Sequence, residues 1–320
     1  MYPASGNMKN TTLLLIALWL SGVYCVREVD IDLPEQPVKI VALSHFTPGQ
    51  PFRVEVSLSQ ALTDAGDPAI PFSADVAIAL EGKFLDKLYR VSDNGQRIYW
   101  ESRDLVAPES EYLLSVRIGG LEPVEALSYA PNPVLVDYVQ IDTVNMRLID
   151  LTDGKVAMRV PLKIFVANLP AEKRYFAFDL TQEIATYPVV GGEIRLDLPP
   201  DEYTYEATKF LADGRTLALV YDTPEKVVLV NENFWSDNRN YLAIDALVPF
   251  NPAEQRPRHL MVEWRTLSEE FYRYHLSVAR QGNNLPLNDP DALYNNVLGG
   301  YGNFSGYSVD RDTIFLPYPF

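Results

Sequence analysis

Between Val38 and residue 130, hydrophobic and polar residues alternate over several short stretches of the chain. The clearest are VKIVALSHF, FRVEVSLSQ, ADVAIAL and EYLLSVRI. A period of two is typical of half-buried β-strands, because successive side chains point to opposite faces. Between FLDKLYRV and RIYWES, the tripeptide Asp93-Asn94-Gly95 predicts a hairpin, because Asn-Gly favours a tight turn. About seven strands spaced roughly 8–12 residues apart predict an immunoglobulin-like β-sandwich over residues 38–130.

The second half of the chain has the same alternation in longer strands. Ala130-Pro131-Asn132-Pro133 precedes it and predicts a stiff break between two domains. Strands from VLVDYVQIDTVNMRLI to HLMVEWRT then predict a second antiparallel β domain over residues 134–320. Pro161 lies inside one of them and lacks a backbone donor, which predicts that its strand is at a sheet edge or bulged.

One helix is predicted, over residues 268–281. Ser268 can accept a hydrogen bond from the first turn, and the two glutamates after it favour the positive end of the helix. Gly282 provides a stop. The apolar stripe of this helix consists of Phe271, His275 and Val278. The predicted fold is therefore mainly β, with one helix near the C-terminus.

The glycine-rich run NNVLGGYGNFSGY, residues 295–307, has two interpretations. It is either a loop whose Tyr301, Phe304 and Tyr307 contact a ligand or partner, or a bulged closing strand. In a closing strand, the glycines lie where backbones pass closely and the aromatic rings pack inward. We favour the closing strand. Trp235, in the polar stretch FWSDN, is a further candidate for an exposed contact.

Residues 8–25, MKNTTLLLIALWLSGVYC, have the cation, apolar run and short polar end of a secretory signal. The apolar run is too short to span a bilayer. Since the signal ends in the only cysteine, we predict a signal peptide over residues 1–24, with its true start at Met8, and a lipidated Cys25. Tyr24 is an unusual residue before a lipidated cysteine. The alternative is ordinary signal-peptidase cleavage with Cys25 incidental. The polar stretch that follows predicts a tether up to residue 37.

Composition limits the classes of partner. The 320 residues carry a formal net charge of −16. Nucleic acids need clustered Lys and Arg, so no nucleic-acid partner is predicted. A single cysteine also excludes an internal disulfide.

No catalytic, metal or cofactor motif is found in the sequence. His45, His259 and His275 lie far apart along the chain, outside any HExxH or Cys-His pattern, so we predict structural roles and no metal site. Ser305 lies in GNFSG rather than GxSxG, and the neighbouring glycines lack the dinucleotide-binding spacing. We therefore predict a protein that is not an enzyme and has no cofactor. A hydrolase whose carboxylates come together only in the fold stays open.

Three stretches carry a family resemblance: VKIVALSHFTPGQPFRVEVSLSQAL, WRTLSEEFYRYHLSVARQGNN and YNNVLGGYGNFSGYS. With the signal, the cysteine and the acidic, proline-containing tether, they resemble the Bacteroidota lipoproteins grouped as domain of unknown function 4249. The resemblance implies an outer-membrane lipoprotein, often encoded beside a TonB-dependent receptor. It supplies no catalytic residues. Acidic residues just after Cys25 resemble the signal for display on the cell exterior in such lipoproteins.

The expected function is that of a lipid-anchored cell-surface protein of the outer membrane. It would act without catalysis as a ligand-capture or docking partner of a TonB-dependent β-barrel transporter. The alternative is a stand-alone glycan-binding or adhesive surface module, suggested by the immunoglobulin-like half and the tyrosine content. The ligand and the oligomeric state do not follow from the sequence.

Overall fold

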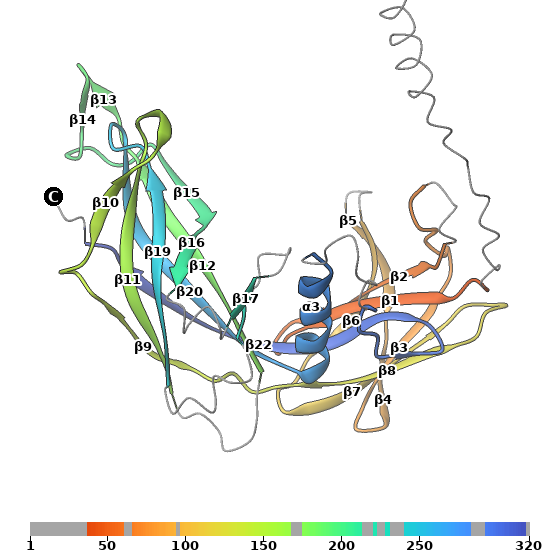
Figure 1. Cartoon of the computed structure of the whole chain (residues 1–320). Helices are drawn as coiled ribbons and strands as arrows, with labels where there is room; N and C mark the ends of the chain where they lie inside the picture. Colours follow the sequence, from red (N-terminus) through yellow and green to blue (C-terminus); the bar gives the residue numbers. More distant parts are fainter. Residues whose placement is uncertain are drawn as a thin grey trace, which may run out of the picture. The chain divides into compact units, whose positions relative to one another are not determined.

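A computed structural model of the chain describes residues 37–60, 66–93, 97–167, 175–212, 220–222, 228–230, 240–282 and 292–317. Strands make up 63% of these described residues and helix 7%, so the prediction of a mainly β protein with one helix is confirmed for them (Figure 1). Within these ranges, no helix is long and apolar enough to cross a membrane. Residues Val38–Phe320 form one compact unit.

The first half of the described chain packs strands from two sheets around one core (Figure 1). Rings of Phe46, Phe52, Trp100 and Tyr112 fill this core. One sheet contributes, in spatial order, β1 (Ile40–Phe46), β2 (Pro51–Leu58), β6 (Arg97–Leu105) and β5 (Tyr89–Asp93). The other consists of β21 (Val297–Leu298), β8 (Val124–Ala130), β7 (Ser110–Arg117), β3 (Asp75–Leu80) and β4 (Lys83–Lys87).

The stretch FLDKLYRV, expected as one strand, is two. β4 pairs with β3 in one sheet, and β5 pairs with β6 in the other. Leu88 lies between them with its side chain buried, and its N–H donates to the Val76 carbonyl at 2.8 Å. The chain changes sheets at this residue, and the hydrophobic pattern does not reveal it because Leu88 faces a core. The predicted hairpin is present, since Asp93 pairs with Arg97; residues 94–96 lie outside the described ranges.

The second half encloses a larger core between two further groups of strands. One group is β12 (Tyr175–Thr186), β20 (Gln255–Leu267), β15 (Glu202–Ala207), β18 (Val228–Val230) and β17 (Val220–Asp222). The opposite sheet contains β9 (Val136–Ile141), β10 (Arg147–Asp150), β11 (Val156–Val166), β19 (Tyr241–Phe250) and β16 (Lys209–Ala212). A separate hairpin, β13 (Val189–Val190) with β14 (Glu193–Ile194), and the short 3₁₀ helix η1 (Thr152–Gly154) complete this half.

Strand β22 (Tyr301–Phe315) belongs to both halves. Its first part pairs in parallel with β1, from Val41↔Tyr301 onwards, and its later part pairs antiparallel with β20. Phe304 therefore contributes to the first core, whereas Leu316, just after the strand, contributes to the second. A single sheet thus passes both cores. The division into two domains near residues 131–133 stays a prediction.

The glycines of the 295–307 run lie where backbones pass closely, as the closing-strand interpretation predicts. A Cβ on Gly302 would be 1.9 Å from the Ala42 carbonyl oxygen, and one on Gly300 would be 2.3 Å from the Ile40 oxygen. Gly302 also has a φ of +125°, a conformation that L-residues rarely adopt. Only glycine therefore lets β22 approach β1 at this spacing.

Helix α3 (Glu269–Gly282) lies against the large sheet, where it packs chiefly on β22 (Figure 1). The Ser268 Oγ accepts a hydrogen bond from the Phe271 N–H at 3.3 Å, so the predicted N-cap is confirmed. The buried side of the helix presents Phe271 and Tyr272 to Ala177, Leu229 and Leu267. Burial of this face holds the helix on the sheet.

The strand that carries Pro161, expected at a sheet edge or bulged, is not an edge, but its pairing with β9 has a register shift just after Phe165. β11 pairs with β19 on one side, and on the other side with β10 and then with β9. The pairing changes between Arg159 and Leu162, and the Pro161 carbonyl there accepts from the Asp142 N–H at 2.9 Å. Since the neighbouring strand changes at this residue, the donor that proline lacks interrupts no continuous ladder.

Candidate functional site

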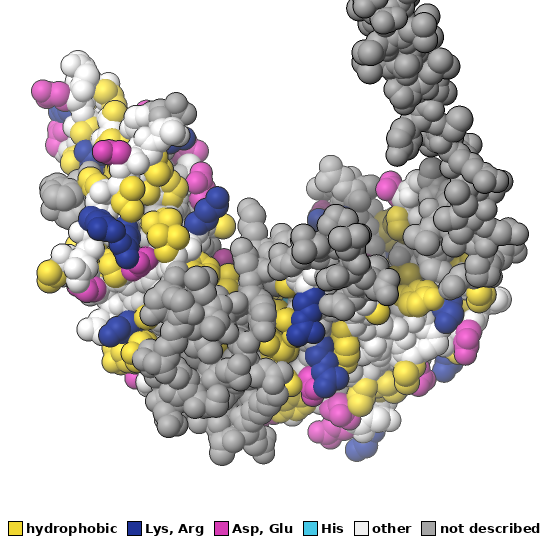
Figure 2. Space-filling view, viewed as in Figure 1, with side chains coloured by type: hydrophobic (Ala, Val, Ile, Leu, Met, Phe, Trp, Pro, Cys, Tyr) yellow, Lys and Arg dark blue, Asp and Glu magenta, His cyan; other side chains and the backbone are white. Residues whose placement is uncertain are grey.

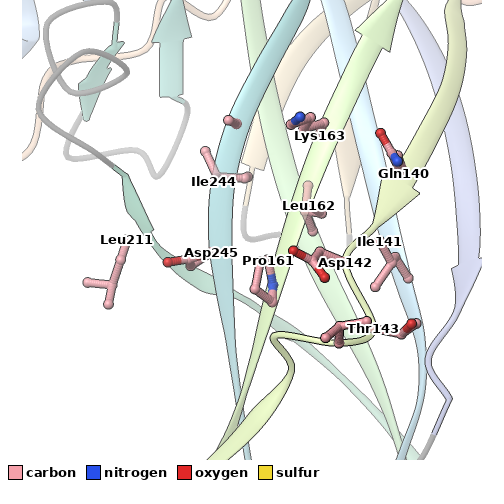
Figure 3. Close-up of a pocket in the computed structure, with 12 residues that line it drawn as sticks. Gln140, Ile141, Asp142, Thr143, Pro161, Leu162, Lys163, Leu211, Ile244 and Asp245 are labelled. Atoms are coloured by element: carbon pink, nitrogen blue, oxygen red, sulfur yellow. The ribbon is translucent and has the colours of Figure 1, made fainter.

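A pocket of about 420 Å³ opens on the sheet formed by β9, β10, β11, β19 and β16 (Figure 3). Val160, Leu162 and Ile164 of β11 are buried in the core, so Pro161 and Lys163 between them face the opposite side. The pocket lies on that outer face. Its volume is within the range of sites that bind small molecules.

The hollow results from side-chain size at paired positions. Pro161 pairs with Asp245, and Lys163 pairs with Ala243, whose methyl group leaves space beside the longer lysine. Leu211 of β16 pairs with Asp245 from the other side. In Figure 3, Asp142 and Asp245 lie on either side of Pro161, and Lys163 follows along β11. Strands of a packed sheet thus hold the floor of the pocket.

Charged groups of the pocket are held by neighbours. Asp245 accepts hydrogen bonds from the Arg159 guanidinium, with Nε at 2.8 Å. The Asn145 side chain, through its Nδ2 at 2.6 Å, keeps the pKa of Asp142 below its ordinary value, so this carboxylate is ionised near neutral pH. The Lys163 Nζ lies 5.2 Å from the centre of the Tyr241 ring. The face of the molecule in Figure 2 also mixes acidic and basic side chains over its described part.

The chemistry of this pocket suits binding. Apolar contact comes from Ile141, Pro161 and Leu211, while Gln140 and Thr143 add hydrogen-bonding groups. Its lining contains no Ser, Cys or Lys nucleophile beside a histidine base. Among the residues that the structure describes, no group of three or more His, Cys, Asp or Glu side chains is placed to hold a metal ion.

The structure brings two of the three histidines together, which sequence reasoning missed. The rings of His45 on β1 and His275 on α3 lie 5.2 Å apart, and Phe271 contacts both. Burial lowers the pKa of His45 to about 4 and that of His275 to about 3. Both are therefore neutral at neutral pH. His259 is elsewhere, with its Nδ1 3.0 Å from a Glu183 carboxylate oxygen.

No local sequence signal pairs His45 with His275. His45 reaches the helix only because β1 lies beside β22, and because α3 packs on β22. Both contacts join distant parts of the chain. The pair forms a buried ring contact between helix and sheet.

The candidate contact residues of the glycine-rich run do not share one surface. Tyr301 is 40% exposed, and the Lys39 Nζ lies 5.2 Å from its ring centre. Phe304 is 0% exposed and packs against Phe46, with ring centres 4.6 Å apart, so its ring offers no surface contact. Tyr307 is half-buried against Phe271. Cys25 and Trp235 lie outside the described residues.

Comparison with known proteins identifies the family. The family model described as "Domain of unknown function (DUF4249)" matches residues 26–313, which is most of the chain. Among curated proteins, no match is found. The family match includes the strands around the first core, the pocket strands, α3 and nearly all of β22. The chain therefore belongs to the DUF4249 family.

Proposed function

We propose that the chain is a Bacteroidota lipoprotein, anchored in the outer membrane through Cys25 and facing the cell exterior. There it captures a ligand for, or docks on, a TonB-dependent β-barrel transporter, and it carries out no catalysis. The observation that carries this proposal is the pocket on β9, β11, β19 and β16, with its rigid floor and mixed apolar and polar lining. The signal-like segment before Cys25 supports the anchor.

We also propose that the first half is an immunoglobulin-like sandwich. The first sheet has the strand order β5-β6-β2-β1, and the second has β4-β3-β7-β8. With the eight strands lettered in chain order as in immunoglobulin domains, these orders are D-E-B-A and C′-C-F-G, which match the two sheets of that fold. Tyr112 on β7 supports it, because its hydroxyl oxygen accepts a hydrogen bond from the Ala107 N–H at 2.7 Å, the arrangement of a tyrosine corner. This architecture supplies a scaffold and by itself assigns no activity.

A stand-alone glycan-binding module is the second candidate, favoured by three rings beside the pocket. Tyr138, Phe165 and Tyr241 form a row across β9, β11 and β19. Sugars stack on open ring faces, but the Tyr138 and Phe165 rings stack on each other with centres 4.3 Å apart. Tyr241 covers Phe165 from the other side at 5.0 Å. Few ring faces are left for a sugar, so we rank the transporter accessory first.

Copurification tests the proposal. Full-length tagged protein is isolated from solubilised outer membranes, and proteins and small molecules bound to it are identified by mass spectrometry. We expect a β-barrel transporter to copurify. Ala243→Phe fills the pocket and should abolish the bound small molecule while the transporter remains; Leu247→Phe, on the same face of β19, serves as the control.

Three outcomes would count against the proposal. Absence of a transporter from the wild-type preparation would refute docking on a barrel. Retention of the small molecule by Ala243→Phe would move the ligand site away from this pocket. Binding to a glycan array by wild type, lost in Ala243→Phe, with no transporter copurifying, would favour the second candidate.

A further inference from the structure

The sheet β21-β8-β7-β3-β4 carries an apolar stripe on its outer face. Phe84, Ala79, Leu113 and Leu127 are paired in register across β4, β3, β7 and β8. Their strand neighbours Ile78, Leu114 and Ala126 are buried in the first core, so the stripe points the other way. Phe84 is 72% exposed and Leu127 is 49% exposed. Contiguous apolar side chains at the surface of a folded protein mark a contact site.

The row of residues beside this stripe carries opposite charges at its two ends. In the adjacent outward-facing row, Lys87 pairs with Ala77, Ala77 with Ser115, and Ser115 with Glu125. The cation therefore lies at the β4 end of the row and the carboxylate at the β8 end. Lys87 forms an ion pair with Asp75 at 2.8 Å, but both groups are largely exposed, which makes that pair weak.

This arrangement is complementary to itself. Consider two copies placed face to face, related by a twofold axis that runs parallel to the strands between the two sheets. β4 of one copy then lies over β8 of the other, so that Lys87 faces Glu125 of the second copy. Phe84 faces Leu127, and the small Ala79 faces the larger Leu113. Opposite charges meet at both ends of the charged row, and within the stripe the small Ala79 leaves space for Leu113 of the other copy.

The twist of β-sheets does not prevent this match. Packed sheets are rotated by about 30° and lie about 10 Å apart. β4 and β8 are each about 7 Å from the proposed axis, given a strand spacing of about 4.8 Å. A rotation of about 30° then displaces the charged ends by only about 4 Å, which the long Lys and Glu side chains span.

We propose that two copies of this chain associate through the outer face of the β21-β8-β7-β3-β4 sheet as a twofold-symmetric dimer. In such an interface the same patch is used on both subunits, as the self-complementary rows require. The net negative charge of the chain does not oppose it strongly, because charges separated by more than about 8 Å are screened at physiological salt. Lys87 and Glu125 then fix the orientation of the two sheets.

The first experiment tests the face. Two full-length copies with different tags are coexpressed, solubilised in a mild detergent and purified through one tag, and the dimer Kd is measured by sedimentation velocity. We expect the two differently tagged wild-type copies to copurify. Leu127→Glu should raise the Kd by at least about 100-fold, because it buries an unpaired carboxylate. Leu196→Glu, at a position 54% exposed in the second half, should leave the Kd unchanged.

The second experiment tests the orientation by exchange of charges. Lys87→Glu and Glu125→Lys each place like charges opposite each other in both pairs of the dimer. Each variant alone should raise the Kd roughly threefold to tenfold, the range expected for exposed ion pairs. An equal mixture of the two variants restores opposite charges at both ends. It should therefore form the mixed dimer in preference to either homodimer.

Several results would overturn the proposal. One is a wild type that sediments as a monomer at every concentration. Another is an equal mixture of the charge variants whose dimer Kd is no lower than that of either variant alone. A Leu127→Glu protein that still dimerises would place any dimer contact elsewhere. Circular dichroism melting of each variant separates loss of association from loss of fold, because these exposed changes should leave Tm within a few degrees of the wild type.

Discussion

Replacing Gly302 by alanine tests whether β22 closes the sheet by direct approach to β1. Two penalties add at this residue. An L-residue at a φ of +125° is strained by about 1–3 kcal/mol. The new Cβ would also lie 1.9 Å from the Ala42 carbonyl oxygen, and relieving such an overlap by shifting backbone costs about 1–3 kcal/mol. We therefore expect Gly302→Ala to lower the free energy of unfolding by about 2–6 kcal/mol.

Urea unfolding followed by tryptophan fluorescence measures this change, since Trp100 lies buried in the first core and Trp264 in the second. Gly49→Ala is the matched control. Gly49 has a φ of +80°, but a Cβ added there would meet no atom within 4 Å, so the residue bears backbone strain without overlap. If Gly302→Ala destabilises the protein no more than Gly49→Ala, the close approach of β22 to β1 is not what requires glycine, and the reasoning fails.

Three further predictions concern the helix and the anchor. Folded His45 and His275 have pKa values of about 4 and 3, below the ordinary 6.5 of the unfolded chain. The unfolded state therefore binds more protons as the pH falls below 6.5, and stability should decrease from pH 6.5 toward 4. Melting curves across this range should show a shallower decrease in His275→Leu; an identical slope would contradict the prediction. Ser268→Ala removes the N-cap of α3 and should lower the free energy of unfolding by about 0.5–2 kcal/mol, measured by urea unfolding. An unchanged free energy of unfolding would contradict this prediction. Cys25→Ser should abolish palmitate labelling and release the protein from membranes, and a variant that stays membrane-bound while the wild type takes up no label would refute lipidation.

The elements that could be predicted from the sequence are those with local causes. Alternation in FRVEVSLSQ predicts β2 because each residue's face depends only on its immediate neighbours. Ser268 and the glutamates after it predict where α3 begins, because a cap acts within one turn. In both cases the cause lies within a few residues of its effect.

The features that could not be predicted depend on distant parts of the chain. Leu88 looks like the middle of one strand, since a strand that changes sheets keeps an apolar residue at the crossing. The pocket arises because Ala243 pairs with Lys163 on another strand, and neither residue signals a hollow by itself. Phe304 faces the core and Tyr301 the solvent only once the register against β1 is set. The local pattern of hydrophobic and polar residues does not show which strands far apart in sequence pair with each other.

The position of β22 also determines when the first core can be completed. A ribosome makes the chain from the N-terminus, so β1 emerges long before its parallel neighbour, which begins only at Tyr301. Until then β1 keeps an unpaired edge, and the core lacks Phe304. Such long-range closure makes folding slow, and the open edge of β1 can pair with other chains until β22 is made. A chain that stops before residue 301 lacks a strand that both cores need, so truncation at the C-terminus affects the N-terminal core as well.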